Sequence, residues 1–371
     1  MRIEIFSSFS SELEKIWQNF EDEAVGSPFQ SYVWLNHWQN NVGGPLLSIV
    51  PQIVIVWNEK ETMAVFPMGI REFLGCSILE WLGGEHTDYM GPLLSKSWKR
   101  MGKDFQFCWN NIIDKLDHFD VIHFKKQKEY FAEMYNPLLS ILKNKKYLYS
   151  SQSELEKSWD VFYAKHTNSK TRQTDRRKLR KLSGLGRVSL KIAENRVVKY
   201  KIIEKMMQQK SRRYNDTGVW DMLSVPEHKV FYEKLVEITD DYIKIHCAAL
   251  IVGDVFVATH VGFVDKSTFY YLMPAHEGGD WERYSPGRLL LEHLIEWAIQ
   301  DDLKVFDFTV GGDNYKKDWC DTETPLFEIL EAVTFKGKIY VIAQNTKQTL
   351  KQMPWLGEKA RQFNVWKKNR K

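Results

Sequence analysis

Three polar residues of different chemistry follow an apolar segment at residues 305–310. This segment, Val-Phe-Asp-Phe-Thr-Val, is apolar on both faces apart from its third and fifth residues, which predicts a central strand. A Gly-Gly pair then leads to a carboxylate, a phenol and an amine, carried by Asp313, Tyr315 and Lys316. Because ligands bind beyond the carboxyl ends of strands in open α/β sheets, we expect these side chains to contact a ligand. The alternative is a turn in which Asp313 caps the backbone and Lys316 is solvated.

The segment before this strand, residues 284–298, has the apolar spacing of a helix with a well-marked start. Ser285 is a favourable N-cap, the proline after it suits the first helical position, and Gly287 lets a ligand approach the backbone. The free N–H groups of the first turn, next to the charge of Arg288, suit an anion such as a pyrophosphate. We therefore expect an anion site here; an ordinary helix cap is the alternative.

Two titratable residues lie inside predicted strands, where they are either structural or catalytic. His260 stands in the middle of an apolar segment, which fits a core histidine or a general base. Asp307 would be buried in its strand, and a buried carboxylate is costly without partners. It is either a hydrogen-bonded structural residue, which we favour, or a base with a raised pKa.

A compact polar loop follows another short predicted strand at residues 78–82. It carries His86 and Asp88, which are too few good ligands for a metal ion, so we predict no metal site in this loop. We expect both side chains to contact an acceptor substrate or the other domain.

Positive charge is concentrated in residues 170–181. They include seven basic residues and one acid, a net charge of +6, whereas the whole chain carries +4, which leaves −2 for the rest. Arg172, Arg176 and Arg180 lie on one face of the predicted helix. This face is either simply solvated or binds an anionic partner, and we favour a phosphorylated small molecule over RNA because no nucleic-acid motif accompanies it.

The length of 371 residues favours two domains, which we place at 1–150 and 151–371 with a boundary near a serine-rich segment. Each half is predicted to contain helices, a meander, and then a helix and a strand, which indicates a duplicated mixed α/β fold. The predicted elements include a hairpin at 46–70, helices at 99–116 and 130–143, a meander at 243–273 and a strand at 338–342. In the helix at 130–143, Asn136-Pro137 argues for a break.

The four cysteines lie far apart without a CxxC pair, so neither a zinc site nor a disulfide scaffold is expected, and a reduced, cytoplasmic setting is favoured. The first residues lack the apolar region of a signal peptide. Residues 26–57 are uncharged, but five amides before Gly43, together with Pro45 and Pro51, argue against a membrane span. We therefore expect no transmembrane segment.

Several short motifs, in their order and spacing, resemble the CelD-like acetyltransferases of the GNAT superfamily over nearly the whole chain. In the second half these motifs are the basic helix 172–180, the strand 256–263, the turn and helix start 284–290, and Asp307-Phe308 followed by residues 312–316. In the first half they are the segments 28–34, 66–68 and 83–89. Their common order makes the resemblance specific.

The resemblance implies two tandem GNAT-like domains, similar to the FemAB peptidyltransferases, with the second domain the more complete. It also implies transfer of an acyl group, in the first place acetyl, from acyl-CoA to an amine, without a metal. Tyr315 would then protonate the leaving thiolate. The implied donor-binding, catalytic and substrate-binding sets are, in that order, Ser285, Gly287, Arg288 and Leu289; Tyr315, Asp313 and His260; and His86, Asp88, Arg176, Arg180 and Lys316.

The phosphate loop of the GNAT family, Gln/Arg-x-x-Gly-x-Gly/Ala, is only partly kept, because Tyr284, Gly287 and Leu289 stand at its defined positions. Arg283 and Arg288 would supply the charge instead. By family analogy the acceptor is an amino sugar or another amine on a cell-surface polysaccharide or lipid precursor. Two further hypotheses are a FemAB-like transferase that uses aminoacyl-tRNA bound to the basic helix, and a non-catalytic accessory protein of polysaccharide biosynthesis. No oligomeric state is predicted.

Overall fold

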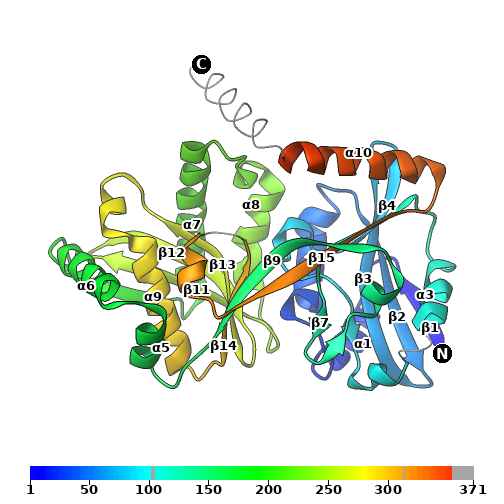
Figure 1. The fold of residues 1–371 in the computed structure, drawn as a ribbon, viewed down its shortest axis with the longest axis horizontal. Coiled ribbons are helices and arrows are strands. Elements are labelled where there is room, and N and C mark those ends of the chain that lie inside the picture. The colour runs from blue at the N-terminus through cyan, green and yellow to red at the C-terminus, as the bar shows by residue number, and fades with distance from the viewer. Residues whose placement is uncertain (102–104, 312–313, 353–371) are drawn as a thin grey trace, which may run out of the picture. The chain divides into compact units, whose positions relative to one another are not determined.

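The structure is a computed structural model that describes residues 1–101, 105–311 and 314–352. The chain divides into two compact units, whose elements are labelled in Figure 1. Unit 1 consists of Met1–Leu148 and the segment from Pro325 onward, and unit 2 is Tyr149–Thr324. Each unit contains a sheet with helices packed on it, so the fold is mixed α/β as the sequence predicts.

Unit 1 is built on a mixed sheet with an aromatic core, in which Trp81 stacks on Phe124 with ring centroids 4.4 Å apart. In sheet order its strands are β1 (Arg2–Phe6), β2 (Val50–Asn58), β3 (Glu61–Phe73), β4 (Cys76–Trp81), β6 (Val121–Lys128) and β15 (Thr322–Ala332), and β5 (Leu93–Leu94) pairs with β3. Its helices are α1 (Ser11–Glu21), α2 (Tyr32–Trp38), α3 (Phe105–Ile113), α4 (Pro137–Ile141) and α10 (Phe335–Gln352).

Unit 2 has a sheet of the same kind, whose central strands β11 to β13 form the predicted meander. In sheet order its strands are β10 (Val188–Ile192), β11 (Lys244–Val252), β12 (Val255–Val264), β13 (Thr268–His276), β14 (Val305–Val310) and β9 (Asn144–Glu154). Its helices are α5 (Trp159–His166), α6 (Ser169–Ser183), α7 (Arg196–Thr217), α8 (Pro226–Glu233) and α9 (Pro286–Gln300).

The two sheets repeat one pattern of strand directions. In both, the first four strands are antiparallel neighbours, the fourth and fifth are parallel, and the sixth is antiparallel to the fifth. The parallel fourth and fifth strands are β4 and β6 in unit 1 and β13 and β14 in unit 2. This repetition confirms the predicted duplicated α/β fold.

Helices α9 and α7 cover opposite faces of the unit 2 sheet. The apolar side of α9 shares a core cluster with Ala248 and Leu250 of β11. The neighbouring residue of β11, Ala249, pairs with Thr259, whose hydroxyl donates to Gln209 of α7 at 2.7 Å. Because successive residues of a strand point to opposite faces, α7 lies on the face away from α9.

The second predicted domain, 151–371, extends beyond unit 2. The segment from Pro325 groups with unit 1 because β15 pairs with β6 from Leu326 to Ala332 and α10 packs on β4 and β6. The unit boundaries therefore fall inside β9 and β15.

Two predicted helices differ from the structure. Residues 130–143 form the small hairpin β7 (Tyr130–Phe131) and β8 (Met134–Tyr135), then the short α4. The predicted break at Asn136-Pro137 is therefore confirmed, and the prediction of helix before it is wrong. The helix breaks because Pro137 can occupy only its first turn, where Asn136 caps the N–H of Leu138 at 3.1 Å. The helix predicted at 99–116 is shortened to α3, after a 3-10 segment at Lys96–Met101.

The strand predicted at 338–342 is wrong, because these residues belong to α10. The run Ile339-Tyr340-Val341-Ile342 has the composition of a strand, yet its side chains separate over the faces of a helix. Tyr340 is buried, whereas Ile339 and Ile342 are exposed.

None of the helices in the described part of the chain combines the length and the apolar character that a membrane span requires.

Candidate functional site

The parallel strands β13 and β14 pair only at their beginnings. Residues 268–270 pair with residues 305–307, and no pair follows among the described residues. β13 nevertheless continues to His276 as a partner of β12. The sheet thus opens at the carboxyl ends of two parallel strands, where ligands bind in open α/β sheets.

His260 lies in the sheet beside this opening and has no exposed surface. The register between β12 and β13 shifts there, and the N–H of Leu272 donates to Nε2 of His260 at 3.3 Å. The imidazole stacks on Tyr271 with centroids 4.7 Å apart. Burial holds the pKa of His260 well below its usual 6.5, so the ring is neutral. Of the two predicted roles, a core histidine or a general base, these contacts fit the first: His260 stabilises a backbone bulge in the core.

A cavity of about 390 Å³ lies along the open part of β13. Lys210 and Arg213 of α7, Arg288 of α9 and His276 at the end of β13 line it, together with apolar and aromatic side chains. No carboxylate is among the described residues that line it. The cavity therefore favours an anionic ligand.

The first turn of α9 forms one wall of the cavity, but it begins differently from the prediction. Ser285 has a left-handed backbone, with φ of 53°, and its side chain makes no capping bond because a capping side chain needs an extended backbone. Its carbonyl accepts from the N–H groups of Arg288 and Leu289, at 3.0 and 3.2 Å, and its hydroxyl accepts from Lys178 at 2.7 Å. The proline after Ser285 has no N–H, and the N–H groups of Ser285, Arg288 and Leu289 each have a backbone acceptor. Within the described residues, the N–H of Gly287 makes no such backbone hydrogen bond.

Gly287 faces His276 across the cavity wall. A Cβ at residue 287 would lie 3.1 Å from Cδ2 of His276, which is tighter than an ordinary contact. His276 itself is fixed on both nitrogens: Nδ1 donates to the carbonyl of Glu277 at 2.8 Å, and Nε2 accepts from Arg213 at 3.0 Å. Any larger residue at 287 would thus disturb a hydrogen-bonded histidine.

Arg288 joins the cavity to a cluster of carboxylates. Its guanidinium lies 3.2 Å from Asp175 of α6, 3.2 Å from Glu292 and 3.7 Å from Asp318, and stacks over Trp319 at 4.9 Å. Burial, and then the charge of Asp175, raise the pKa of Glu292 to about 8, so this carboxyl holds a proton at neutral pH. With Glu292 neutral, the carboxylates of Asp175 and Asp318 are the groups that balance the positive charge of Arg288.

The residues predicted beyond β14 have three different outcomes. Lys316 is buried and donates to the carbonyls of Phe308 and Val310, at 2.7 and 3.0 Å, so it caps the end of the strand and is not solvated. Tyr315 lies in the 3-10 turn Asn314–Asp318, but its side chain is outside the described part of the structure. Asp313 lies outside the described residues. Asp307 is buried and accepts from the N–H of Thr309 at 2.7 Å, as a structural residue would.

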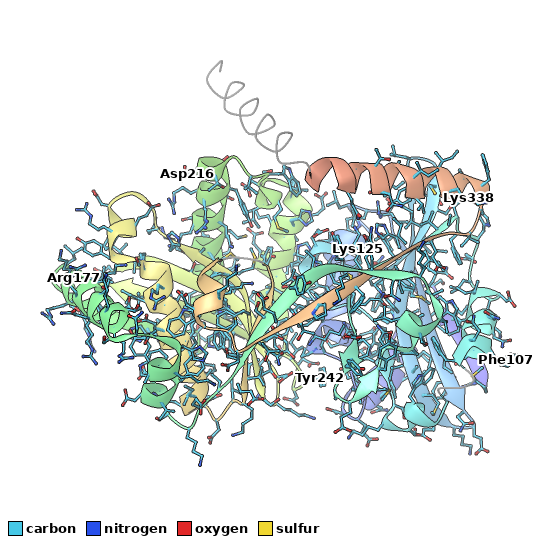
Figure 2. All side chains as sticks on the ribbon, in the orientation of Figure 1. Phe107, Lys125, Arg177, Asp216, Tyr242 and Lys338 are labelled. Carbon is cyan, nitrogen blue, oxygen red and sulfur yellow. The ribbon has the colours of Figure 1, made fainter. Side chains whose placement is uncertain are left out.

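The remaining predicted residues lie away from the cavity lining. Leu289 is buried in the core under α9. Arg176 and Arg180 are exposed on α6, where Figure 2 shows their neighbour Arg177. In unit 1, His86 is buried, and the carboxylate of Asp88 lies 3.9 Å from Nζ of Lys126.

Sequence reasoning missed Lys210, Arg213, Tyr271 and Trp319 as lining residues. The two cations stand three positions apart on α7, a spacing that puts them on one face of a helix. That spacing is common on solvated helices, so only the fold reveals that this face meets β13 and α9. Trp319 is fully buried, and nothing in its sequence neighbourhood marks it as a lining residue.

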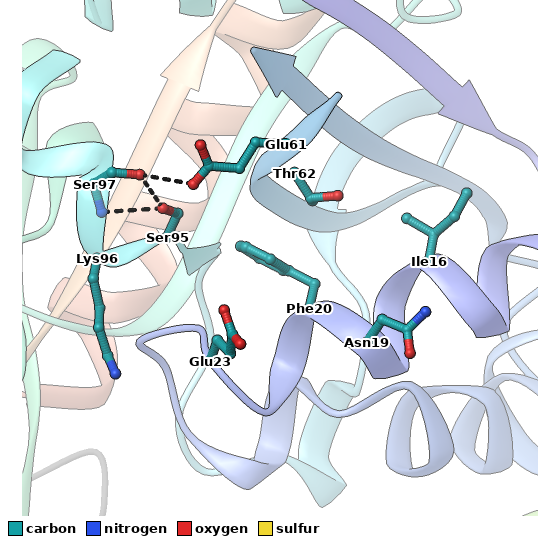
Figure 3. Close-up of a pocket in the computed structure, with 9 residues that line it drawn as sticks. All are labelled: Ile16, Asn19, Phe20, Glu23, Glu61, Thr62, Ser95, Lys96 and Ser97. Carbon is teal, nitrogen blue, oxygen red and sulfur yellow. Dashed lines mark hydrogen bonds between the residues drawn. The ribbon is translucent and has the colours of Figure 1, made fainter. Parts of the chain in front are cut away.

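A second, larger hollow of about 500 Å³ lies in unit 1, between α1 and the start of β3 (Figure 3). Its hydroxyl groups are mutually bonded: Ser95 and Ser97 lie 2.5 Å apart, and Ser97 donates to Glu61 at 3.1 Å. Glu23 and Glu61 give its wall negative charge, which Lys96 only partly balances. This hollow therefore lacks the cationic lining of the unit 2 cavity.

No group of three or more His, Cys, Asp or Glu side chains suited to a metal ion occurs within the described ranges.

Comparison with known proteins identifies what this architecture resembles. Residues 169–317, which include the cavity lining except Trp319, match the family model of an acetyltransferase (GNAT) domain. The chain matches no curated protein at a significant level. Among solved structures, FemX gives a TM-score of 0.60 at 10% identity, over 88% of this chain and 97% of FemX.

Two further structures match over similar lengths. L-PGS from Bacillus licheniformis gives a TM-score of 0.52 at 10% identity, over 91% of this chain and 96% of that chain. The C-terminal domain of a proposed lysylphosphatidylglycerol synthetase from Agrobacterium fabrum gives 0.52 at 9% identity, over 92% and 97%. At such identities the likeness establishes the fold alone. The cationic cavity thus lies in a segment similar to an acetyltransferase (GNAT) domain, within a GNAT-like mixed α/β fold.

Proposed function

We propose that the chain is an acyl-CoA-dependent N-acyltransferase whose donor binds in the cavity of unit 2. The observation that carries this proposal is the cationic cavity at the opening between β13 and β14, inside the segment that matches the acetyltransferase (GNAT) domain. In the reaction, an amine attacks the thioester carbonyl, an amide bond forms and the C–S bond breaks. The amine loses a proton and the thiolate gains one.

The residues present fit the phosphates of such a donor. Lys210 and Arg213 would attract them, and Gly287 leaves room for a phosphate near its N–H, as a side chain would not. The hydroxyl of Ser285 already accepts from Lys178, and the guanidinium of Arg288 is already paired with Asp175. We therefore expect these two residues to contribute less to phosphate binding, at the edge of the site. Cations from α7 therefore compensate for a helix start that offers few free donors.

The finer assignment follows the family analogy. We propose acetyl as the acyl group, an amino sugar or another amine of a cell-surface polysaccharide or lipid precursor as the acceptor, and Tyr315 as the acid for the thiolate, with Asp313 nearby in sequence. His276 is a further candidate for the proton of the amine, because its Nε2, which accepts from Arg213, would be free to accept from the amine if Arg213 turned to a phosphate.

The test is thermal unfolding of the full chain with CoA, acetyl-CoA and longer acyl-CoAs. A ligand at 100 times its dissociation constant should stabilise the protein by about 2.7 kcal/mol. Gly287→Asp should abolish the shift, because it places a carboxylate against His276 and the phosphates. Leu185→Asp, an exposed substitution in the turn after α6, serves as a charge-matched control and should keep the shift. No shift with any donor would refute the proposal and favour an accessory role.

A second candidate is transfer from aminoacyl-tRNA, which the surface of α6 favours. Arg176, Arg177, Arg180 and Lys181 are exposed, and the single acid of the helix, Asp175, is buried against Arg288. Binding of tRNA that weakens steeply with salt and is lost in Arg176→Ala/Arg180→Ala, without any shift by acyl-CoA, would establish this candidate instead.

A further inference from the structure

Helix α10 of unit 1 has an exposed apolar face. The side chains of Phe335, Ile339 and Ile342 are 79%, 59% and 66% exposed, and their spacing of four and three residues places them on one face of the helix. Val333, just before the helix, is 53% exposed. Contiguous apolar surface of this kind marks an interaction site more often than isolated exposed residues do.

The opposite face of α10 already holds the helix to its unit. Tyr340 is buried, with its hydroxyl 3.5 Å from Nδ1 of His123, and Gln348 donates to the buried carboxylate of Glu328 at 3.1 Å. The helix is thus anchored without the residues of its apolar face. That face remains available for a partner.

Lysines flank the apolar face on both sides. At 100° per residue, Lys338 lies on one side of the line of Phe335, Ile339 and Ile342, and Lys336 and Lys347 lie on the other. All three lysines are exposed; Lys336 also lies 3.6 Å from the buried Asp120, and Figure 2 shows Lys338 on α10. Residues 335–352 contain no Asp or Glu. The face is therefore apolar at its centre and positive at its edges.

We propose that this face of α10 binds the surface of an anionic membrane. A helix that lies in the interface buries its apolar side chains at the boundary between headgroups and acyl chains, while lysines at its edges meet the anionic headgroups. The three apolar side chains and three lysines of α10 match this requirement. Such binding is peripheral and needs no membrane-spanning helix.

Charge favours a membrane over two other occupants. A second copy of the chain docked through the same face would bring the lysines of both helices together. The segment that follows α10, residues 353–371, has six Lys or Arg and one Glu, so folding it onto this face would also add like charge. An anionic surface is the occupant that the lysines attract.

The test is co-sedimentation of the full chain with vesicles of phosphatidylcholine, with and without phosphatidylglycerol. We expect binding to the anionic vesicles that weakens with salt. Replacing Phe335, Ile339 and Ile342 together by serine should lower the partition coefficient at least about tenfold, because the apolar contribution is lost. Lys338→Gln/Lys347→Gln should weaken binding to anionic vesicles about tenfold or more at low salt, and leave the weak binding to neutral vesicles unchanged.

The matched control replaces three residues of similar exposure in unit 2, Val161, Leu185 and Val197, by serine. This variant should bind vesicles as the wild type does. Equal binding by the wild type and the α10 triple variant would overturn the proposal. So would a wild-type dimer in sedimentation velocity that the triple variant abolishes, since the face would then join two copies. Circular dichroism of each variant checks that α10 remains folded.

Discussion

The two units share one strand order, but they differ in what lies beside the carboxyl end of the fifth strand. In both, that strand contains a non-glycine residue with a left-handed backbone, Lys126 in β6 and Thr309 in β14, with φ of 52° and 57°. In unit 1 the chain returns to β6, where Met90 pairs with Gln127 and donates to the carbonyl of Lys126 at 3.0 Å. In unit 2 the corresponding part of β13 lines a cavity instead. The repeated fold thus has two equivalent openings. The one in unit 1 is occupied by the loop that carries Met90, and the one in unit 2 is a cavity.

The difference extends to one buried glutamate in each unit. In unit 1, burial alone would raise the pKa of Glu328, but hydrogen bonds from His123 and Gln348, with Lys145 at 3.2 Å, lower it to about 2. In unit 2, burial and the neighbouring Asp175 raise the pKa of Glu292 to about 8. Glu328 is charged and holds α10 through Gln348. Glu292 is protonated and lies next to Arg288, which lines the cavity. The two units thus hold their buried glutamates in opposite protonation states at neutral pH.

The largest expected effect concerns Glu292. Between pH 4.5 and about 8 the folded protein binds a proton that the unfolded chain releases, so stability falls as pH rises through this window. The loss is on the order of a few kcal/mol. Glu292→Gln, which stays neutral, should flatten the dependence in urea unfolding at a series of pH values. Glu194→Gln, at an 80% exposed side chain, is the control, and equal slopes in all three proteins would contradict the assignment.

Glu328 should behave in the opposite way. Its folded pKa of about 2 lies below the ordinary 4.5, so its contribution is complete above pH 4.5 and is lost as pH falls towards 2. We expect about 3 kcal/mol from this carboxylate. Glu328→Gln should remove the acid dependence that it causes, measured by the same unfolding series. An unchanged acid limb would mean that Glu328 is not held in the charged form.

A smaller effect is expected at the filled opening of unit 1. Nζ of Lys126 donates to the carbonyl of Thr87 at 2.9 Å, and hydrogen bonds to a charged group contribute about 1.5 to 3 kcal/mol. Lys126→Met should lower stability by about 2 kcal/mol while leaving the acyl-CoA dissociation constant unchanged. Isothermal titration of the variant checks the second part. Weaker donor binding would show that the opening of unit 1 takes part.

The smallest expected effect concerns the two cations of α7 that line the cavity of unit 2. Lys210→Ala/Arg213→Ala should raise the dissociation constant for CoA about tenfold, which is about 1.4 kcal/mol, and reduce its salt dependence. Lys201→Ala, at an exposed position of the same helix, should do neither. Isothermal titration at low and high salt measures both quantities. Equal affinities of the double variant and the control would place the phosphates elsewhere.

Local signals predicted the elements that frame the cavity, and tertiary contacts decided the rest. The apolar run at 305–310 and the proline at 286 predicted β14 and the start of α9, because strand burial and the first helical position impose strong local preferences. The partner of Arg288 could not be predicted, since Asp175 lies 113 positions away. Lys210 could not be predicted as a lining residue either, because the sequence around a helical lysine does not indicate which part of the protein its side chain faces.

The unit boundaries inside β9 and β15 have a consequence for synthesis on the ribosome. Unit 2 is one continuous segment, Tyr149–Thr324, whereas the sheet of unit 1 takes its last strand from Leu326–Ala332. Unit 1, most of which is translated first, can therefore complete its sheet only after unit 2 has been synthesised. Until then, β6 has an unpaired strand edge. A chain cut at residue 150 would release a first half that lacks β15 and keeps this edge open to other chains.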